Sequence, residues 1–249
     1  MRSFLKRRDV AKACVCLAIA SLPMLGRASS AKSEDGLKVG TLRVGKILFL
    51  GNSITLHEPA PKIGWTGNWG MAASAPEKDY VHLLLGRVAK AAGGTPKVMI
   101  RNIADFERNM SGFNIPEALK QELAFEADLL ILAIGENATS PKTDEARKQF
   151  SDAMRDLLSQ LGQHGHPKLF VRGQFWPDAE KNRLLKQSCA EVGGIFVDLG
   201  EMGIDPANSA RSERKIEDEG VAGHPGDRGM AAIADALWKA MKQEGEAKD

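Results

Sequence analysis

Three polar residues in this chain of 249 residues could together carry out acyl transfer. Ser53 stands in the segment Gly-Asn-Ser-Ile-Thr (51–55), directly after the apolar run 46–50. Asn137 follows a second apolar run, and His224 lies just before the last amphipathic segment. A hydroxyl, a carboxamide and an imidazole can respectively attack an ester, stabilise the oxyanion and move the proton. The three residues therefore predict nucleophilic catalysis by a serine.

The serine needs a partner, because its hydroxyl is a weak nucleophile at neutral pH unless a base lies within about 3 Å. His224 is the predicted base. His82 lies in an apolar helical pattern, and His164 and His166 precede a strand-like run, which places them at the opposite edge of a sheet. His57 is nearer to the serine in sequence, but its loop shows no other sign of a base.

The segments around Ser53, Asn137 and His224 resemble the SGNH (GDSL-like) hydrolase family, from about residue 46 to the final helix. In that family the first block carries the serine, the third carries a G-x-N asparagine and the last carries the histidine. The resemblance implies an esterase with Ser53 as nucleophile and His224 as general base and then acid. It also implies that the Ser53 backbone N–H and the Asn137 side chain donate hydrogen bonds to the oxyanion.

Two departures from the family pattern concern the first and second blocks. Asn52 stands where the family has an aspartate. The second block, normally an N-x-G-x-x-G-like turn, reads Asn-Ile-Ala-Asp-Phe-Glu at 102–107. The third oxyanion donor would then be the backbone N–H of Ala104 or, if the loop is longer than usual, that of Gly112.

A third departure concerns the group that orients the histidine. Val221 occupies the position of the family's acidic residue, three residues before His224. We expect a Ser–His dyad in which a backbone carbonyl orients the histidine. A carboxylate from 217–219 or from Asp227 is the alternative.

Apolar runs alternate with segments of helical period, which predicts an α/β fold. The expected architecture is a three-layer α/β/α sandwich on a flavodoxin-like parallel sheet of about five strands. The predicted strands are 46–50, 97–103, 129–134, 169–173 and 195–199, and the clearest predicted helices are 144–161 and 228–242. The carboxyl ends of such strands form a ligand crevice, so the loops of Ser53 and Asn137 should meet there.

The stretch 56–78 is long for a connection between a strand and a helix. Its Trp65 and Trp69 could stack on sugar rings and its Asn68 could bind hydroxyls, and Glu136 is also expected to contact substrate. Alternatively, one or both tryptophans anchor the loop to the core.

The amino-terminal residues 1–31 are predicted to be an export signal, because basic residues precede an apolar stretch at 13–22 that is too short to span a bilayer. Residues 7–12 resemble a twin-arginine motif, and an ordinary secretory signal explains the same charges. The other predicted parts are a linker at 32–45, the hydrolase domain at 46–242 and a frayed tail at 243–249. The mature protein should be periplasmic or extracellular in a bacterium, with no integral membrane segment once the signal is removed.

The composition and motifs of the chain limit which classes of partner and cofactor are expected. The 34 basic residues nearly balance the 32 acidic ones, and no basic stripe interleaved with aromatics points to nucleic acid. Zinc-ligand spacing, a P-loop and a dinucleotide fingerprint are missing from the sequence, so no metal or cofactor is expected. The predicted substrate is a small-molecule or glycan ester, with O-acetyl groups on carbohydrate as the first choice. A lipid or thioester hydrolase and a catalytically silent carbohydrate-binding domain are the alternatives.

Overall fold

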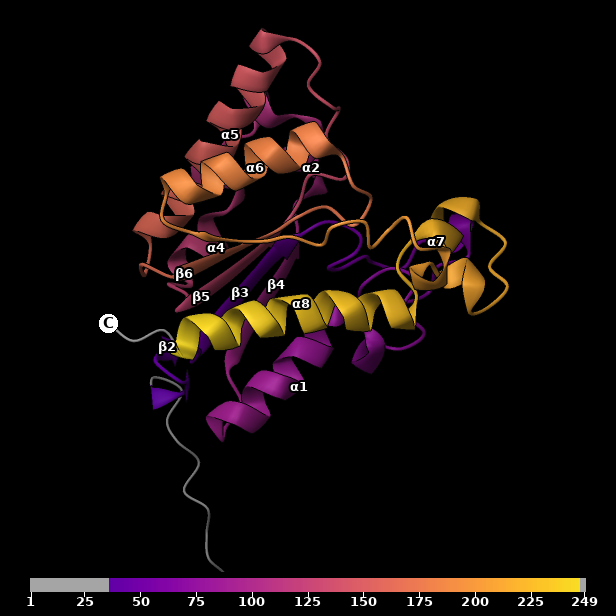
Figure 1. Cartoon of the computed structure of the whole chain (residues 1–249), viewed down its shortest axis with the longest axis horizontal. Coiled ribbons are helices and arrows are strands. Elements are labelled where there is room, and N and C mark those ends of the chain that lie inside the picture. Colours follow the sequence, from indigo (N-terminus) through magenta and orange to yellow (C-terminus); the bar gives the residue numbers. More distant parts are fainter. Residues whose placement is uncertain (1–35, 247–249) are drawn as a thin grey trace, which may run out of the picture. The chain divides into compact units, whose positions relative to one another are not determined.

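The computed structural model describes residues 36–246, which form a parallel β-sheet between two layers of helices (Figure 1). The five strands of this sheet are ordered β4-β3-β5-β6-β7. They are β3 (Lys46–Gly51), β4 (Lys97–Asn102), β5 (Leu129–Ala133), β6 (Lys168–Arg172) and β7 (Ile195–Val197). This is the flavodoxin-like order, in which the winding reverses between β3 and β5. The predicted fold class is confirmed.

Alternation along the strands explains why both faces of the sheet are covered. In β3, Ile47 and Phe49 belong to the core on one face, whereas Leu48 and Leu50 belong to the core on the other. All four side chains are buried. A strand buried on both sides reads as one continuous apolar run, which is why this strand is recognisable in the sequence.

Two long helices cover each face of the sheet. In Figure 1, α5 and α6 lie above the sheet, and α1 and α8 lie below it. The long helices are α1 (Tyr80–Ala92), α5 (Asp144–Gln163), α6 (Ala179–Glu191) and α8 (Asp227–Glu246). Shorter helices are α2 (Ala104–Arg108), α3 (Ile115–Ala118), α4 (Lys120–Ala124) and α7 (Glu219–Gly223). Single 3-10 turns are η2 (Pro61–Ile63), η3 (Pro76–Lys78), η4 (Met110–Gly112), η5 (Pro206–Asn208) and η6 (Ala210–Ser212).

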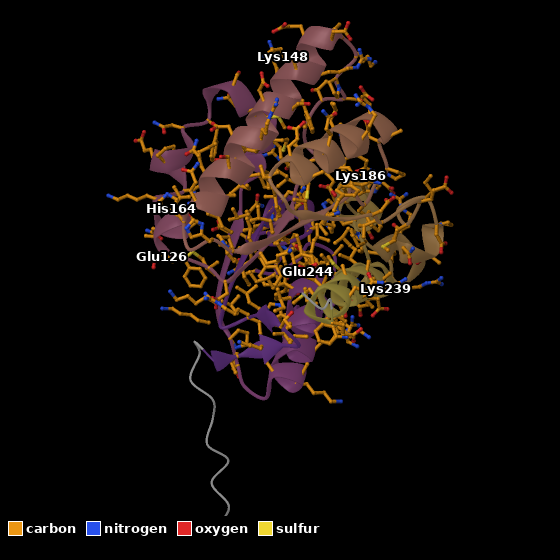
Figure 2. All side chains as sticks on the ribbon, turned by 60° about the vertical axis from the view of Figure 1, so that its left-hand side comes forward. Glu126, Lys148, His164, Lys186, Lys239 and Glu244 are labelled. Carbon is orange, nitrogen blue, oxygen red and sulfur yellow. The ribbon has the colours of Figure 1, made fainter. Side chains whose placement is uncertain are left out.

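The charged side chains of the long helices point away from the sheet. Lys148 on α5, Lys186 on α6 and Lys239 on α8 are exposed and project outward (Figure 2). The opposite stripe of α8, which includes Met230, Ile233 and Leu237, is buried. The i, i+3, i+7 spacing of these apolar residues is what predicted the helix.

The predicted linker at 32–45 is wrong for residues 37–44. These residues form an antiparallel hairpin of β1 (Lys38–Val39) and β2 (Leu42–Arg43). Leu37, Val39, Leu42 and Val44 are buried in the same core as α1 and α8. The two strands are too short to show a clear period, and the alternation becomes meaningful only once a neighbouring helix is there to cover it.

The predicted fraying of the tail is wrong as far as residue 246. Helix α8 continues to Glu246, and the carbonyl of Gly245 accepts the Thr41 backbone N–H at 2.8 Å. Gly40 adopts φ +60°, and a side chain there would collide with the Gly245 backbone. The hairpin therefore holds the end of α8. Residues 247–249 and the predicted signal at 1–31 lie outside the described residues.

Within 36–246 no helix has both the length and the apolar content that a membrane span requires.

Candidate active site

A tight turn at the end of β3 presents Ser53. The Asn52 side-chain oxygen accepts the Ile54 N–H at 3.1 Å, and its backbone carbonyl accepts the Thr55 N–H at 2.9 Å. The Ser53 carbonyl accepts the Met71 N–H at 2.8 Å from the long loop that follows. The backbone is therefore held on both sides of the serine, whose hydroxyl stays at the open carboxyl edge of the sheet.

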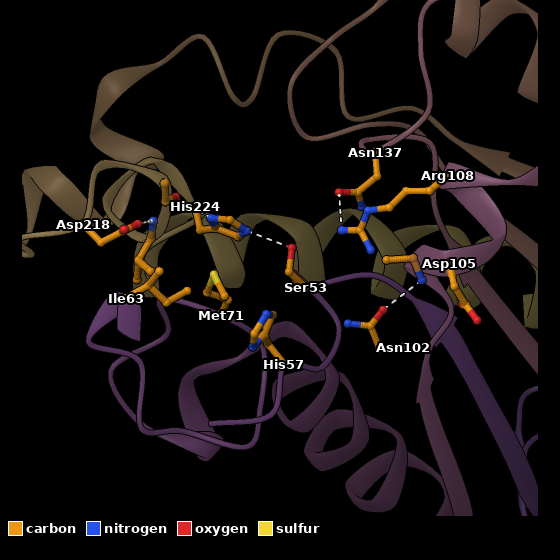
Figure 3. A pocket seen from close by; sticks show the side chains of 13 residues that line it. Ser53, His57, Ile63, Met71, Asn102, Asp105, Arg108, Asn137, Asp218 and His224 are labelled. Atoms are coloured by element: carbon orange, nitrogen blue, oxygen red, sulfur yellow. Dashed lines mark hydrogen bonds between the residues drawn. The ribbon is translucent and has the colours of Figure 1, made fainter. Parts of the chain in front are cut away.

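The structure brings Ser53 and His224 into direct contact (Figure 3). Ser53 Oγ lies 2.8 Å from His224 Nε2, and His224 Nδ1 lies 2.7 Å from the carbonyl oxygen of Gly220. A carbonyl can only accept, so Nδ1 must carry the proton. In the neutral ring Nε2 is then unprotonated and accepts the hydrogen bond from the serine hydroxyl, which is the tautomer that a general base needs.

The carbonyl contact is the one that the dyad hypothesis requires. The four carboxylates considered as alternative orienting groups bond to other partners: Glu217 to Lys215, Asp218 to the Val221 N–H, Glu219 to Arg211, and Asp227 to Ser74. Asp218 caps the first turn of α7 and so fixes the helix that supplies the carbonyl of Gly220. The short helix α7 thus supplies a backbone acceptor for the histidine.

Burial lowers the pKa of His224 below its usual 6.5. The hydrogen bond to Gly220 opposes this shift, the nearby His57 adds to it, and the charges of Glu136 and Asp218 oppose it more weakly. A lowered pKa keeps the imidazole neutral, and therefore competent as a base, at neutral pH.

This shift predicts the pH dependence of ester hydrolysis. Only the neutral form of His224 can accept a proton, so kcat/KM should be level at neutral pH and fall about tenfold per pH unit once the pH drops below the pKa of the free enzyme. The midpoint should lie below 6.5. Initial rates on an acetyl ester across the pH range give the profile, with circular dichroism at each pH as the control for unfolding. A midpoint above 6.5 would contradict the prediction.

Asn137 enters the pocket from the loop after β5, across from Ser53 (Figure 3). Its Nδ2 donates to Glu107 Oε2 at 2.5 Å, and its Oδ1 accepts from Arg108 Nη2 at 3.2 Å. The backbone N–H of Ser53 has no acceptor among the described residues. The Ser53 N–H and the second Nδ2 hydrogen of Asn137 therefore have no acceptor among the described residues.

Gly135 makes the turn into this loop possible. Its φ of +119° is a conformation that residues with a side chain rarely adopt, and a Cβ there would collide with the Gln174 side chain. The Gly135 N–H donates to Glu107 Oε1, which ties the turn to α2.

The expectation that Glu136 contacts substrate is wrong. Its side chain is 3% exposed and pairs with the fully buried Arg172 at 2.8 Å. Burial works to raise the pKa of Glu136, but the Arg172 guanidinium together with hydrogen bonds from Phe175 and Asn52 outweighs it and lowers the pKa. Glu136 is therefore a buried anion beneath the site. In the sequence, Glu136 lies between a glycine and an asparagine in a loop, a position that gives no sign of burial or of the ion pair with Arg172.

The two backbone donors suggested for the oxyanion are not free in the structure. Ala104 lines the pocket, but its N–H donates to Asn102 Oδ1 at 2.9 Å. Gly112 is not among the pocket residues, and its N–H donates to the Asn109 carbonyl at 3.2 Å. The expectation for Gly112 is wrong because the chain turns into α2 immediately after β4, which carries Gly112 past the pocket.

The structure contradicts the predicted substrate contacts of the two tryptophans in the long loop. Trp65 is 7% exposed, and its ring packs edge-on against Trp69 at 5.4 Å. Their indole N–H groups donate to the backbone carbonyls of His57 and Ala73. Asn68 is exposed but does not line the pocket. The tryptophans anchor the loop, which was the alternative left open.

The pocket has a volume of about 490 Å³ and is lined by further residues besides Ser53, Asn137 and His224. They include His57, Ile63 and Met71 from the long loop, and Asn102, Asp105 and Arg108 from β4 and α2. Figure 3 shows Arg108 reaching into the pocket and Asp105 turned away from it. Asn102, Asp105 and Arg108 lie in or just after the segment 102–107 at the end of β4, so their place at the carboxyl edge of the sheet was a signal in the sequence.

Two further observations bear on ligands. Within 36–246 no group of three or more His, Cys, Asp or Glu side chains is arranged to hold a metal ion. Trp176, in the loop after β6, is 37% exposed, and its ring meets that of His224 edge-to-face at 5.2 Å. An exposed aromatic ring therefore borders the base.

The chain was compared with family models, curated proteins and solved structures, and it matches solved structures. No protein-family model matches the sequence. No curated protein matches it either. The chain is similar to a structure described as a GDSL-like lipase from Bacteroides ovatus ATCC 8483, with a TM-score of 0.53 and 14% identity over 80% of this chain and 99% of that one.

Two further structures are similar at lower scores. A structure described as a GDSL-like lipase from Bacteroides uniformis ATCC 8492 has a TM-score of 0.49 and 14% identity, over 78% of this chain and 93% of that one. An acetyl xylan esterase from the rumen bacterium Butyrivibrio proteoclasticus has a TM-score of 0.49 and 13% identity, over 80% of this chain and 63% of that one. The likeness to the Bacteroides ovatus structure shows a shared fold.

Proposed function

We propose that this chain, which shares the fold of the Bacteroides ovatus GDSL-like lipase, is a serine esterase. The observation that carries the proposal is the contact of 2.8 Å between Ser53 and His224, with the Gly220 carbonyl selecting the required tautomer. The same contact weighs against a silent carbohydrate-binding domain, which has no need of a hydroxyl paired to a correctly protonated imidazole at the base of an open pocket.

The mechanism follows from these positions. His224 Nε2 takes the proton from Ser53 as Oγ bonds to the ester carbon. The carbonyl oxygen becomes an oxyanion between the Ser53 N–H and Asn137 Nδ2, where each donor is worth about 3–4 kcal/mol. The carbon–oxygen bond to the alcohol then breaks, and His224 gives its proton to the departing oxygen. A water molecule, deprotonated by His224, attacks the acyl–serine ester and releases the acid and free Ser53.

The substrate that we propose is a short acyl ester, first of all an O-acetyl group on carbohydrate. The departing alcohol receives its proton from His224, so it must lie on that side of the pocket, where Trp176 offers an exposed ring. Aromatic faces bind the apolar faces of sugars as well as other flat surfaces. On the acyl side, Asn102, Arg108 and Asn137 make the wall polar, which disfavours a long lipid chain.

We also propose that the protein is exported and that residues 37–246 form one hydrolase domain. The support for export is the basic start and the short apolar stretch before residue 31. The support for one domain is that the hairpin at 37–44 and the end of α8 pack into the same core as the sheet.

The acyl preference tests the proposed function. Nitrophenyl acetate and butyrate should be cleaved with higher kcat/KM than the octanoate and laurate, because the polar wall gives no gain for additional methylenes. Release of acetate from an acetylated oligosaccharide, measured by chromatography, should accompany this preference. A higher kcat/KM for the longest chains would instead favour a lipid or thioester hydrolase. Failure to cleave any ester while glycans still bind would favour the silent domain.

A further inference from the structure

We propose that Glu107 is a positioning residue which, together with Arg108, holds the Asn137 carboxamide in the orientation that stabilises the oxyanion. We call these two consecutive residues of α2 the amide clamp. The inference rests on the proposed function, because it assigns to Asn137 the task of an oxyanion donor.

The two residues of the amide clamp form hydrogen bonds with opposite ends of the Asn137 side-chain amide. Glu107 Oε2 accepts from Asn137 Nδ2 at 2.5 Å, and Arg108 Nη2 donates to Asn137 Oδ1 at 3.2 Å (Figure 3 shows the Arg108 bond). A carboxylate cannot donate and a guanidinium cannot accept. A flipped amide would set oxygen against the carboxylate and N–H against the guanidinium, so the two neighbours favour a single orientation.

That orientation leaves one N–H available. The Nδ2 group of Asn137 carries two hydrogens, and Glu107 is its single acceptor among the described residues. The second hydrogen has no acceptor among the described residues. The Asn137 side chain that carries it borders the pocket opposite Ser53. Preorganised donors of this kind are worth more than mobile ones, because no reorganisation is needed when the charge develops.

Every hydrogen-bond partner of Glu107 is an N–H group. The side chain is buried, and besides Asn137 Nδ2 it faces the N–H groups of Gly135 and Asn137 and the Nδ2 of Asn52. All four partners are donors. Burial and the neighbouring Glu136 raise the pKa of Glu107, and the hydrogen bonds from Asn137, Gly135 and Asn52 oppose the rise.

The clamp also gives a reason for asparagine at position 52. Asn52 Nδ2 lies 3.2 Å from Glu107 Oε1 and 2.7 Å from Glu136 Oε2, so it donates toward two buried carboxylates at once. An aspartate here would place a third negative charge beside two others, with Arg172 paired to Glu136 as the nearby cation. The family's aspartate is therefore incompatible with this arrangement.

The Glu107→Gln variant tests the clamp. Glutamine has the same shape, but its NH₂ group faces a donor, either Asn137 Nδ2 or the backbone N–H groups, so the amide loses its fixed orientation. We expect kcat to fall by about 10²-fold with KM nearly unchanged, since removal of an oxyanion donor costs about 10² to 10³ in kcat. The matched control is Glu122→Gln, which removes another buried carboxylate, paired with Arg101 and outside the pocket. Its kcat should not change.

A double-mutant cycle separates positioning from general destabilisation. If Glu107 acts through Asn137, then Glu107→Gln introduced into an Asn137→Ala enzyme should lower kcat by less than about twofold. An equal loss in both backgrounds would overturn the inference. A Glu107→Gln enzyme with wild-type kcat would overturn it as well.

A second readout does not depend on activity. The side-chain amide resonances of Asn137, observed by NMR, should shift in Glu107→Gln and stay in place in Glu122→Gln. Unchanged resonances in Glu107→Gln would contradict the clamp. If the wild type cleaves no ester, the proposed function fails by itself, and these resonances still decide whether Glu107 orients the amide.

Discussion

Replacing Ser53 by alanine is expected to lower kcat on an acetyl ester by about 10⁴-fold or more. The variant lacks the oxygen that bonds to the ester carbon, and no other serine, threonine or cysteine lines the described pocket. The remaining activity would come from the oxyanion donors and from substrate binding, which act on water only weakly.

The measurement is steady-state hydrolysis of nitrophenyl acetate together with labelling by a fluorophosphonate. Intact mass and peptide mapping should place the label on Ser53 in the wild type, with no label at that position in Ser53→Ala. Ser159→Ala, on the outer helix α5, is the control for handling and folding. Wild-type rates in Ser53→Ala would show that the bond is broken by a different nucleophile.

Replacing His224 by glutamine is expected to lower kcat by about 10³-fold or more. Glutamine can still occupy the space between Ser53 and Gly220, but an amide cannot take a proton from the serine at neutral pH. The acid limb of the pH profile should disappear in this variant, because the group that titrates is gone.

Two neighbouring variants serve as controls for His224. His57→Gln alters the other histidine of the pocket, and Asp218→Asn alters the pocket carboxylate that caps α7. Each should keep kcat within a few-fold of wild type if the backbone carbonyl is what orients the ring. A loss in Asp218→Asn as large as that in His224→Gln, at unchanged melting temperature, would assign the orienting role to the carboxylate.

The parts of the site that the sequence predicted lie directly beside regular elements. Ser53 follows the buried strand β3, and Asn137 follows β5, its neighbour in the sheet. Parallel strands end at one edge, so local periodicity is enough to bring these two loops together. His224 could be placed because it precedes one of the two clearest amphipathic helices, whose buried stripe determines how that helix lies on the sheet.

The wrong predictions share a different cause. Trp65, Trp69 and Glu136 have side chains suited to binding a ligand, and which group they meet depends on residues far away in the chain. The indole N–H groups found backbone carbonyls within their own loop, and the carboxylate found the guanidinium of Arg172. A residue type states what a side chain can bond to, and only packing selects the partner.

The amino-acid sequence by itself predicted the α/β layers and the loops of Ser53 and Asn137 at the carboxyl edge of the sheet, because both follow from short-range periodicity. The tertiary structure decided which group orients His224, which residues hold Asn137 and which carboxylates Asn52 contacts. Each of these depends on hydrogen bonds between segments that are remote in the chain, and such bonds form only after burial has excluded water and brought one particular donor to one particular acceptor.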